Sequence, residues 1–399
     1  MDINTEEMKK KLLEKTESVK KTLEEKAGRK LPWKMIAAAI AGVVLVVGVA
    51  ANVGGGGNPS SYLKIEGTVV MGISNPEKVP AHVKIPEGIT EIERNAFKVS
   101  AKDENYKGSR AVKTLSLPKS LKKIGNGAFL DCTYLESVEL PNGVTEIGSY
   151  AFDDCTSLKT VTIGNGVTEF GDDVFEKCTS LESVSIGNGA TKIGNGAFKG
   201  CTSLKNVKIP DSVTEIGWSA FKDCTSLASV NIPDGVTKIN DGAFDGCTSL
   251  KNVKIPDGVT EIGYGAFKGC TSFKTVTIPD GVTKIGVEAF YGCASLASVN
   301  IPDGVTKIGE RAFSRCTSLA SVEIPEGVKE IGGFGDCTSL ASVTIPGSVT
   351  KIGFYAFKGC PPLKEVRYNN TIKRLKASAH EEAFEEGMVI HCTDGDVVW

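Results

Sequence analysis

Twelve cysteines and three histidines are the side chains of this 399-residue chain best suited to metal binding or nucleophilic chemistry. Most of the cysteines, from Cys132 to Cys316, follow one another at intervals of 23 residues. Metal sites typically use ligands paired at short spacing, and this series has no such pair. His82, His380 and His391 have no repeated nucleophile or carboxylate beside them, so the sequence predicts no catalytic triad. We therefore predict a non-enzymatic protein with no metal site and no cofactor.

Two interpretations of the cysteines remain. Each cysteine of the series occupies the same apolar position of a repeated unit, so it is expected to face the core. Stacked thiols on neighbouring units could form disulfides, but parallel side chains give poor disulfide geometry. We favour buried free thiols, because cysteine often serves as a small apolar residue. Free thiols are less usual in an exported protein and would fit a reducing habitat.

Aspartates recur at one turn of four successive units, at Asp234, Asp257, Asp280 and Asp303. A column of carboxylates could bind calcium, but this register lacks the dense oxygen set that calcium requires. We favour the ordinary role of Asp as a turn residue. The chain has 46 basic and 48 acidic residues, and this balance argues against nucleic acid as a partner.

The spacing of these residues comes from an internal repeat. Phenylalanines from Phe129 to Phe313 recur every 23 residues, and Phe97, Phe334 and Phe357 extend the series to about twelve units within residues 79–368. One unit, residues 250–270, is LKNVKIPDGVTEIGYGAFKGC. Length alone would suggest two or three domains, but an array of repeats forms one continuous body.

Each unit predicts its own local structure. The pattern Leu-x-x-Val-x-Ile has period two and predicts a short strand with one inward face. Pro-Asp-Gly turns the chain, and Val-Thr-Lys/Glu-Ile forms a second short extended piece. Gly-x-x-Ala-Phe-x-x-Cys is too short for a long helix and predicts a helical or 3₁₀ turn. Stacked units bury these apolar positions against identical neighbours, so we predict a β-rich leucine-rich repeat solenoid with short strands and short helical or 3₁₀ turns.

The segments that flank the array should cap it. Residues 62–78 include an alternating stretch, Tyr62 to Ile73, that is expected to close the N-terminal end. Residues 369–399 form the C-terminal cap, with a helix predicted over residues 373–387 and a hairpin predicted from Val389 to Trp399 around a glycine turn. We expect this hairpin to cover the last coil.

Before the array, the chain divides into a charged tail, an apolar segment and a linker. Residues 1–34 predict a solvated cytoplasmic helix, or else an interfacial or partner-binding helix. Met35 to Val53 is long and apolar enough for a transmembrane helix, and residues 54–61 are a flexible linker. The basic residues Arg29, Lys30 and Lys34 place the N-terminus in the cytoplasm. We expect a single-pass protein of the cell membrane with extracellular repeats. Cleavage near Val49-Ala50-Ala51 as a signal peptide is the alternative.

The pattern Leu-x-x-Val-x-Ile-Pro-x-x-Val-x-x-Ile-Gly-x-x-Ala-Phe-x-x-Cys resembles the BspA-like leucine-rich repeat family of microbial surface proteins. The resemblance covers about residues 79–392. It implies surface display and adhesion to proteins or other cells, without naming a ligand. The sequence departs from commoner leucine-rich repeats because Gly or Asp, not Asn, is expected after the strand, which excludes the asparagine-ladder form.

The exposed strand positions of the middle units are candidates for partner binding. They are small, polar or basic, and the set is Lys205, Asn206, Lys208, Asn231, Asn252, Lys254, Thr277 and Asn300. They form either a solvated sheet surface with lysines that discourage edge pairing, or a docking face for a protein or glycan on another cell or in the matrix.

Two further columns run along the array. Trp218 and Tyr264 share one column with Phe354, and they are either anchors for a partner or packed under the turn. In the second short strand, one position alternates between Lys and Glu over five successive units, from Lys192 to Lys284. Stacking would set each charge beside opposite charges. The favoured function is surface recognition or adhesion; the alternatives are a structural spacer or coat without a ligand, and signalling through the N-terminal tail.

Overall fold

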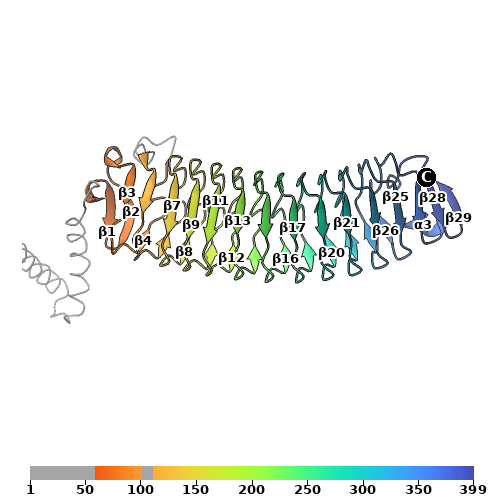
Figure 1. Cartoon of the computed structure of the whole chain (residues 1–399), viewed down its shortest axis with the longest axis horizontal. Helices are drawn as coiled ribbons and strands as arrows, with labels where there is room; N and C mark the ends of the chain where they lie inside the picture. Colours follow the sequence, from red (N-terminus) through yellow and green to blue (C-terminus); the bar gives the residue numbers. More distant parts are fainter. Residues whose placement is uncertain (1–58, 100–110) are drawn as a thin grey trace, which may run out of the picture.

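The computed structural model describes residues 59–99 and 111–399 as an elongated solenoid whose coils stack along one axis (Figure 1). The β-rich solenoid predicted from the repeat is confirmed. The predicted tail and anchor, residues 1–34 and 35–53, lie outside the described residues. Within the described part of the chain, no helix has the length and apolar character required to cross a membrane.

The Leu-x-x-Val-x-Ile stretches form one sheet of 15 strands, which is parallel except for its last pair. Neighbouring coils pair in register, as where Val230 lies beside Val253. The strands are β3 (His82–Lys84), β5 (Thr114–Ser116), β7 (Ser137–Leu140), β9 (Thr160–Ile163), β11 (Ser183–Ile186), β13 (Asn206–Lys208), β15 (Ser229–Asn231), β17 (Asn252–Lys254), β19 (Thr275–Thr277), β21 (Ser298–Asn300), β23 (Ser321–Glu323), β25 (Ser342–Ile345), β27 (Glu365–Tyr368), β28 (Val389–Cys392) and β29 (Gly395–Val398).

The second short extended piece of each unit forms a second ladder, which is divided into sheets of eight and six strands. The eight-stranded sheet contains β1 (Leu63–Glu66), β2 (Val69–Ile73), β4 (Glu91–Ile92), β6 (Lys123–Ile124), β8 (Glu146–Ile147), β10 (Glu169–Phe170), β12 (Lys192–Ile193) and β14 (Glu215–Ile216). The six-stranded sheet contains β16 (Lys238–Ile239), β18 (Glu261–Ile262), β20 (Lys284–Ile285), β22 (Lys307–Ile308), β24 (Glu330–Ile331) and β26 (Lys351–Ile352).

The division between these two sheets has a local cause. Most coils have glycine directly after the second strand, and its N–H bonds to the preceding coil, as Gly217 bonds to Ile193. Asn240 replaces that glycine, and its side-chain Nδ2 donates to the carbonyl of Ile216 at 2.7 Å in place of the backbone. Strands β14 and β16 are therefore not paired.

The segment Gly-x-x-Ala-Phe-x-x-Cys differs from the predicted helical or 3₁₀ turn. Its N–H groups alternate between two kinds of acceptor. Lys268 and Cys270 bond to carbonyls three residues back, whereas Phe267 bonds at 2.8 Å to Ala289 of the next coil. The alternation requires a left-handed residue at every fourth position, such as Gly265 with φ 54°. The segment is consequently a third ladder between coils, not a helical turn.

Stacked columns of identical side chains fill the core. Rings of successive coils lie 5.4 Å apart where Phe244 meets Phe267, with 5° between their planes. The column continues beyond the predicted end of the array at residue 368, because Phe384 stacks on Phe357 at 5.5 Å. Each buried cysteine donates to a carbonyl of the preceding coil, as Cys247 Sγ does to Phe221 at 3.1 Å.

Both ends of the solenoid are closed by antiparallel hairpins. At the N-terminal end, short 3₁₀ turns η2 (Pro59–Ser61) and η3 (Pro76–Lys78) flank the hairpin of β1 and β2. At the other end, β28 and β29 form a hairpin that adds to β27, where the hairpin from Val389 was predicted.

The C-terminal helix is shorter than predicted. Helix α3 (Ile372–Ser378) begins at the side-chain cap of Thr371 and ends well before residue 387. Two interactions end it: Ala379 pairs with Ile352 at the end of the second ladder, and Phe384 is buried on the phenylalanine column. Pairing and burial at the open end of the solenoid thus override local helix propensity.

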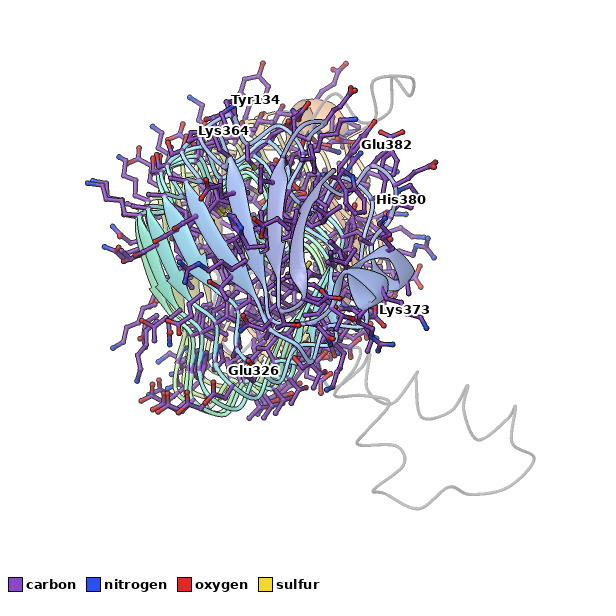
Figure 2. The ribbon with its side chains drawn as sticks, turned by 90° about the vertical axis from the view of Figure 1, so that its right-hand side faces the viewer. Tyr134, Glu326, Lys364, Lys373, His380 and Glu382 are labelled. Carbon is purple, nitrogen blue, oxygen red and sulfur yellow. The ribbon has the colours of Figure 1, made fainter. Side chains whose placement is uncertain are left out.

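Figure 2 looks along the solenoid from its C-terminal end, with the last strands facing the viewer. Lys364 precedes β27 and Glu326 follows β23, and the two residues lie at opposite ends of the strands. Lys373, on α3, lies to one side of the sheet. In the middle strands of the large sheet the residues on either side of the buried valine are exposed, so these outer positions point away from the core.

Candidate functional site

The structure places seven of the eight predicted partner-binding residues on five adjacent strands, β13 to β21, and Lys205 directly before β13. In these strands the central valine is buried and its two neighbours are exposed. Asn231, Lys254, Thr277 and Asn300 form one row, since each lies in register with the next. Asn206 and Asn252 belong to a second row, on either side of Ser229. The result is a flat polar surface, which we call the strand face.

The strand face is less basic than its lysines suggest. Lys205 Nζ lies 2.9 Å from Glu182, and Lys254 Nζ lies 3.8 Å from Asp234. All four side chains are largely exposed, so these pairs contribute little to stability. Lys208 has no ion-pair partner among the described residues. The face therefore offers amides, hydroxyls and partly neutralised lysines.

The aromatic column is exposed, so these side chains are not packed under the turn. Trp218 is 61% exposed, Tyr264 51% and Phe354 43%. In five other coils this position holds a polar side chain that accepts an N–H of the next coil, as Asn195 Oδ1 accepts that of Trp218 at 2.9 Å. Trp218 cannot accept such a bond from Asp241. The fold therefore gives no stabilising role to the tryptophan at this position.

The alternating charges of the second ladder form ion pairs between coils. Glu261 lies 3.3 Å from Lys238 and 2.9 Å from Lys284. Lys192 pairs with Glu215 at 2.9 Å, but the division of the ladder separates Glu215 from Lys238. Hydrogen bonds from the two flanking lysines lower the pKa of Glu261.

A groove of about 930 Å³ follows the edge of the large sheet over five coils, and sequence reasoning missed it. At this edge Asn142 Oδ1 accepts the N–H of Asn165, and Asn165 Oδ1 accepts that of Asn188, each at 2.9 Å. The expectation that an asparagine ladder is excluded was therefore wrong for these three coils. The signal was present as Gly-Asn-Gly in place of Pro-Asp-Gly after two strands.

One carboxylate stands apart from the surface charges. Asp153 is only 8% exposed, and its Oδ1 has no hydrogen-bond partner in the part of the chain that the structure describes. Burial raises the pKa of Asp153 to about 7, and the charges of Asp154 and Glu176 add to the increase. Lys177 opposes it. This side chain is thus a buried acid that titrates near neutral pH.

Among the described residues, His82 meets two hydroxyl groups: Thr114 Oγ1 lies 2.8 Å from its Nδ1 and Ser116 Oγ lies 3.0 Å from its Nε2, so both ring nitrogens are bonded and no carboxylate completes a triad. All twelve cysteines are free, and burial raises the pKa of Cys316 to about 12. The prediction of buried thiols is confirmed for the column, whereas Cys392 is half-buried. His391 Nδ1 lies 2.9 Å from Asp396 on the exposed hairpin, and that contact raises the pKa of the imidazole. Among residues 59–99 and 111–399, no three acidic, His or Cys side chains are placed to hold a metal ion.

Comparison with known proteins assigns the family. The profile of the BspA type leucine-rich repeat region matches residues 78–178, 100–228, 169–297, 216–334 and 260–385. The chain belongs to the BspA-type leucine-rich repeat family. The resemblance inferred from the repeat pattern is therefore confirmed.

Two of the solved structures similar to this chain have the same fold, with TM-scores of 0.55 and 0.56. A leucine-rich repeat protein from Bacteroides ovatus is 29% identical with a TM-score of 0.55, over 81% of this chain and 94% of that one. A leucine-rich cell surface protein from Faecalibacterium prausnitzii is 26% identical with a TM-score of 0.49, over 78% and 93%. The pneumococcal vaccine antigen PcpA shares the fold at 19% identity, with a TM-score of 0.56 over 83% and 91%. Comparison with curated protein sequences gives no match.

Proposed function

We propose that this BspA-type protein recognises a protein on another cell or in the surrounding matrix through its strand face. The observation that carries the proposal is the arrangement of exposed amide, hydroxyl and lysine side chains in two aligned rows on five adjacent strands. Strands held by pairing on both sides keep these rows rigid, so little side-chain and backbone order is lost on binding. Repeat solenoids characteristically bind partners over such extended surfaces.

Membrane anchoring is part of the proposal. The apolar segment Met35 to Val53 is long enough to span the bilayer, and the basic residues before it favour a cytoplasmic N-terminus. Protease added to intact cells should remove the repeats and leave a small membrane-bound fragment with residues 1–34. A full-length chain in the soluble cytosolic fraction would contradict the anchor. A mature soluble form that begins near Ala51 would favour cleavage instead.

The binding test uses purified extracellular matrix and cell-surface proteins immobilised on a sensor, with the full-length chain as analyte. We expect saturable binding to at least one of them. The double variant Lys205→Glu/Lys254→Glu reverses two charges of the strand face without changing buried residues or the lining of the neighbouring groove. It should weaken binding about tenfold or more, because reversed charges oppose the original partner.

The matched control is Lys364→Glu, an exposed lysine at the C-terminal end of the array. It should bind as the wild type does, and both variants should keep the wild-type unfolding midpoint. Absence of saturable binding to every protein of the panel would favour the structural spacer. Equal losses in the strand-face variant and in the control would show that the partner does not use the strand face.

A further inference from the structure

The groove at the edge of the large sheet is a separate surface feature with its own chemistry. It crosses five consecutive coils, and the strand residues on one wall are Ser116, Glu139, Thr162, Ser185 and Lys208. Asn142, Asn165 and Asn188 line the other wall, at the turns that follow the strands. This is the same end of the strands as Glu326 in Figure 2. The groove thus runs along the solenoid axis and across the coils.

Two glycines lie in the middle of the groove. Most coils have proline directly after the strand, but Gly164 and Gly187 occupy that position here. A Cβ on Gly164 would lie 2.6 Å from the backbone nitrogen of Asn142, and one on Gly187 would lie 2.6 Å from the backbone of Gly164. These turns therefore pack directly against one another, in a way that no side chain permits.

The asparagine ladder uses the amide oxygens of its side chains and leaves their amide nitrogens available to a ligand. Because Oδ1 of Asn142 and of Asn165 accepts a backbone N–H of the next coil, the amide nitrogen of each must point elsewhere. No described residue accepts a hydrogen bond from either nitrogen. Both side chains are exposed. They offer N–H donors at a spacing of one coil, about 4.8 Å.

The rest of the lining is mostly uncharged and combines polar with apolar side chains. Thr162 and Ser185 present exposed hydroxyl groups, which both donate and accept hydrogen bonds. Leu115 and Leu117, both partly buried, supply apolar contacts at one end. Among the described residues, three charged side chains border the groove, Lys119, Glu139 and Lys208. A ligand of this groove would need hydroxyl groups at regular intervals, some apolar surface and no large charge.

We propose that the groove binds a linear, uncharged polysaccharide that lies lengthwise along the solenoid, with about one hexose per coil. A sugar chain presents hydroxyl groups that match the amide donors and the threonine and serine hydroxyls, and its C–H faces match the leucines. The proposal rests on the groove alone and is independent of the partner proposed for the strand face.

Other extended ligands fit the groove less well. A peptide that adds to a sheet needs free backbone N–H and C=O groups. The backbone of β9 and β11 is already paired on both sides, and the N–H groups of Asn165 and Asn188 are bonded to side chains. A nucleic acid needs several unopposed cations, whereas the two lysines here share the groove with Glu139.

The test is calorimetric titration of the full-length chain with cello-, manno-, galacto- and xylo-oligosaccharides of increasing length. The chain is kept in a detergent without a sugar headgroup. At least one series should bind, and its affinity should rise with length until the chain has about five sugars, because the groove crosses five coils. Heparin serves as an acidic polysaccharide and an extended polyproline peptide as a non-glycan competitor.

Two variants test the walls. Thr162→Tyr places a ring over the groove at an exposed strand position and should weaken binding at least about tenfold. The double variant Asn142→Asp/Asn165→Asp keeps an oxygen to accept the backbone N–H but removes both amide donors. It should also weaken binding about tenfold, with an unchanged unfolding midpoint, because two hydrogen bonds to the ligand are lost.

Thr277→Tyr is the matched control, because it makes the same change at the equivalent strand position outside the groove. It should leave sugar binding unchanged, as should Lys254→Glu on the strand face. Failure of all four oligosaccharide series to bind would overturn the proposal, and so would affinity independent of length, binding of heparin alone, or equal losses in Thr162→Tyr and Thr277→Tyr.

Discussion

Replacement of Asp153 by asparagine should stabilise the protein at alkaline pH and leave it unchanged in acid. The native carboxyl has a pKa of about 7 because of burial and of the neighbouring Asp154 and Glu176. In the unfolded chain an Asp titrates near its ordinary value of about 3.9. Below about pH 4 both states hold the proton. Between about pH 4 and pH 7 only the unfolded state loses it, so stability falls as pH rises through this window.

The size of the effect follows from the displacement of the pKa. About three pH units correspond to roughly 4 kcal/mol at most, since one unit equals about 1.4 kcal/mol. Relaxation of the surroundings and approach of Lys177, which already opposes the increase, should reduce this to about 2 kcal/mol. Asparagine has similar shape and no charge, so the variant should avoid that penalty above about pH 7.

The assay is urea unfolding of wild type and Asp153→Asn at about pH 4 and about pH 8, with carboxyl NMR titration of Asp153 in the wild type. The control is Asp172→Asn, at an exposed carboxylate whose oxygen accepts the N–H of Asn195. Asparagine can accept the same bond, so this control should change stability little at either pH. The reasoning fails if Asp153→Asn gains nothing at pH 8, or if its gain is equal at both values.

Three further predictions concern the columns of the solenoid. Val253→Asp should unfold the central coils, because an unpaired buried charge costs several kcal/mol. Lys254→Asp, on the exposed face, should change stability little. Thermal unfolding followed by circular dichroism compares the two variants. The thiols of Cys155 to Cys316 should react with a bulky maleimide only after denaturation, and rapid labelling of the native protein would show that the cysteine column is accessible. Glu261→Lys breaks two ion pairs, so it should lower the free energy of unfolding by about 0.5–1 kcal/mol at low salt and by less at high salt. Glu215→Lys breaks one ion pair and should lower the free energy of unfolding by about half as much.

The repeat made the architecture predictable because each unit gives the same structural signal many times. Alternation of Val253 and Ile255 with lysines specified the inward face of β17, and the 23-residue period specified the stacking. The exposed residues of the strand face followed from that register. Parallel pairing between coils, as of Val230 with Val253, then needed no information beyond the repeat.

The features that escaped prediction arise from contacts between coils. The left-handed positions of the phenylalanine turn hold Gly265 in one coil and Arg311 in another, so no single residue type marks them. The groove depends on how closely Gly164 and Gly187 approach their neighbours, which local propensity does not specify. Helix α3 ends early because Ala379 pairs with the last strand of the second ladder and Phe384 stacks on the phenylalanine column.

The division of the second ladder at Asn240 has a mechanical consequence. Elsewhere adjacent coils are joined by hydrogen bonds of the large sheet, the second ladder and the phenylalanine turn. The coils of β14 and β16 are joined by the large sheet and the phenylalanine turn, with one side-chain hydrogen bond from Asn240 in place of the second ladder. Under tension along the axis, such as a bound partner would exert against a fixed end, load at that joint is carried by fewer hydrogen bonds. The solenoid should extend first at the joint between β14 and β16. The parts of the solenoid on either side should stay folded while they move apart.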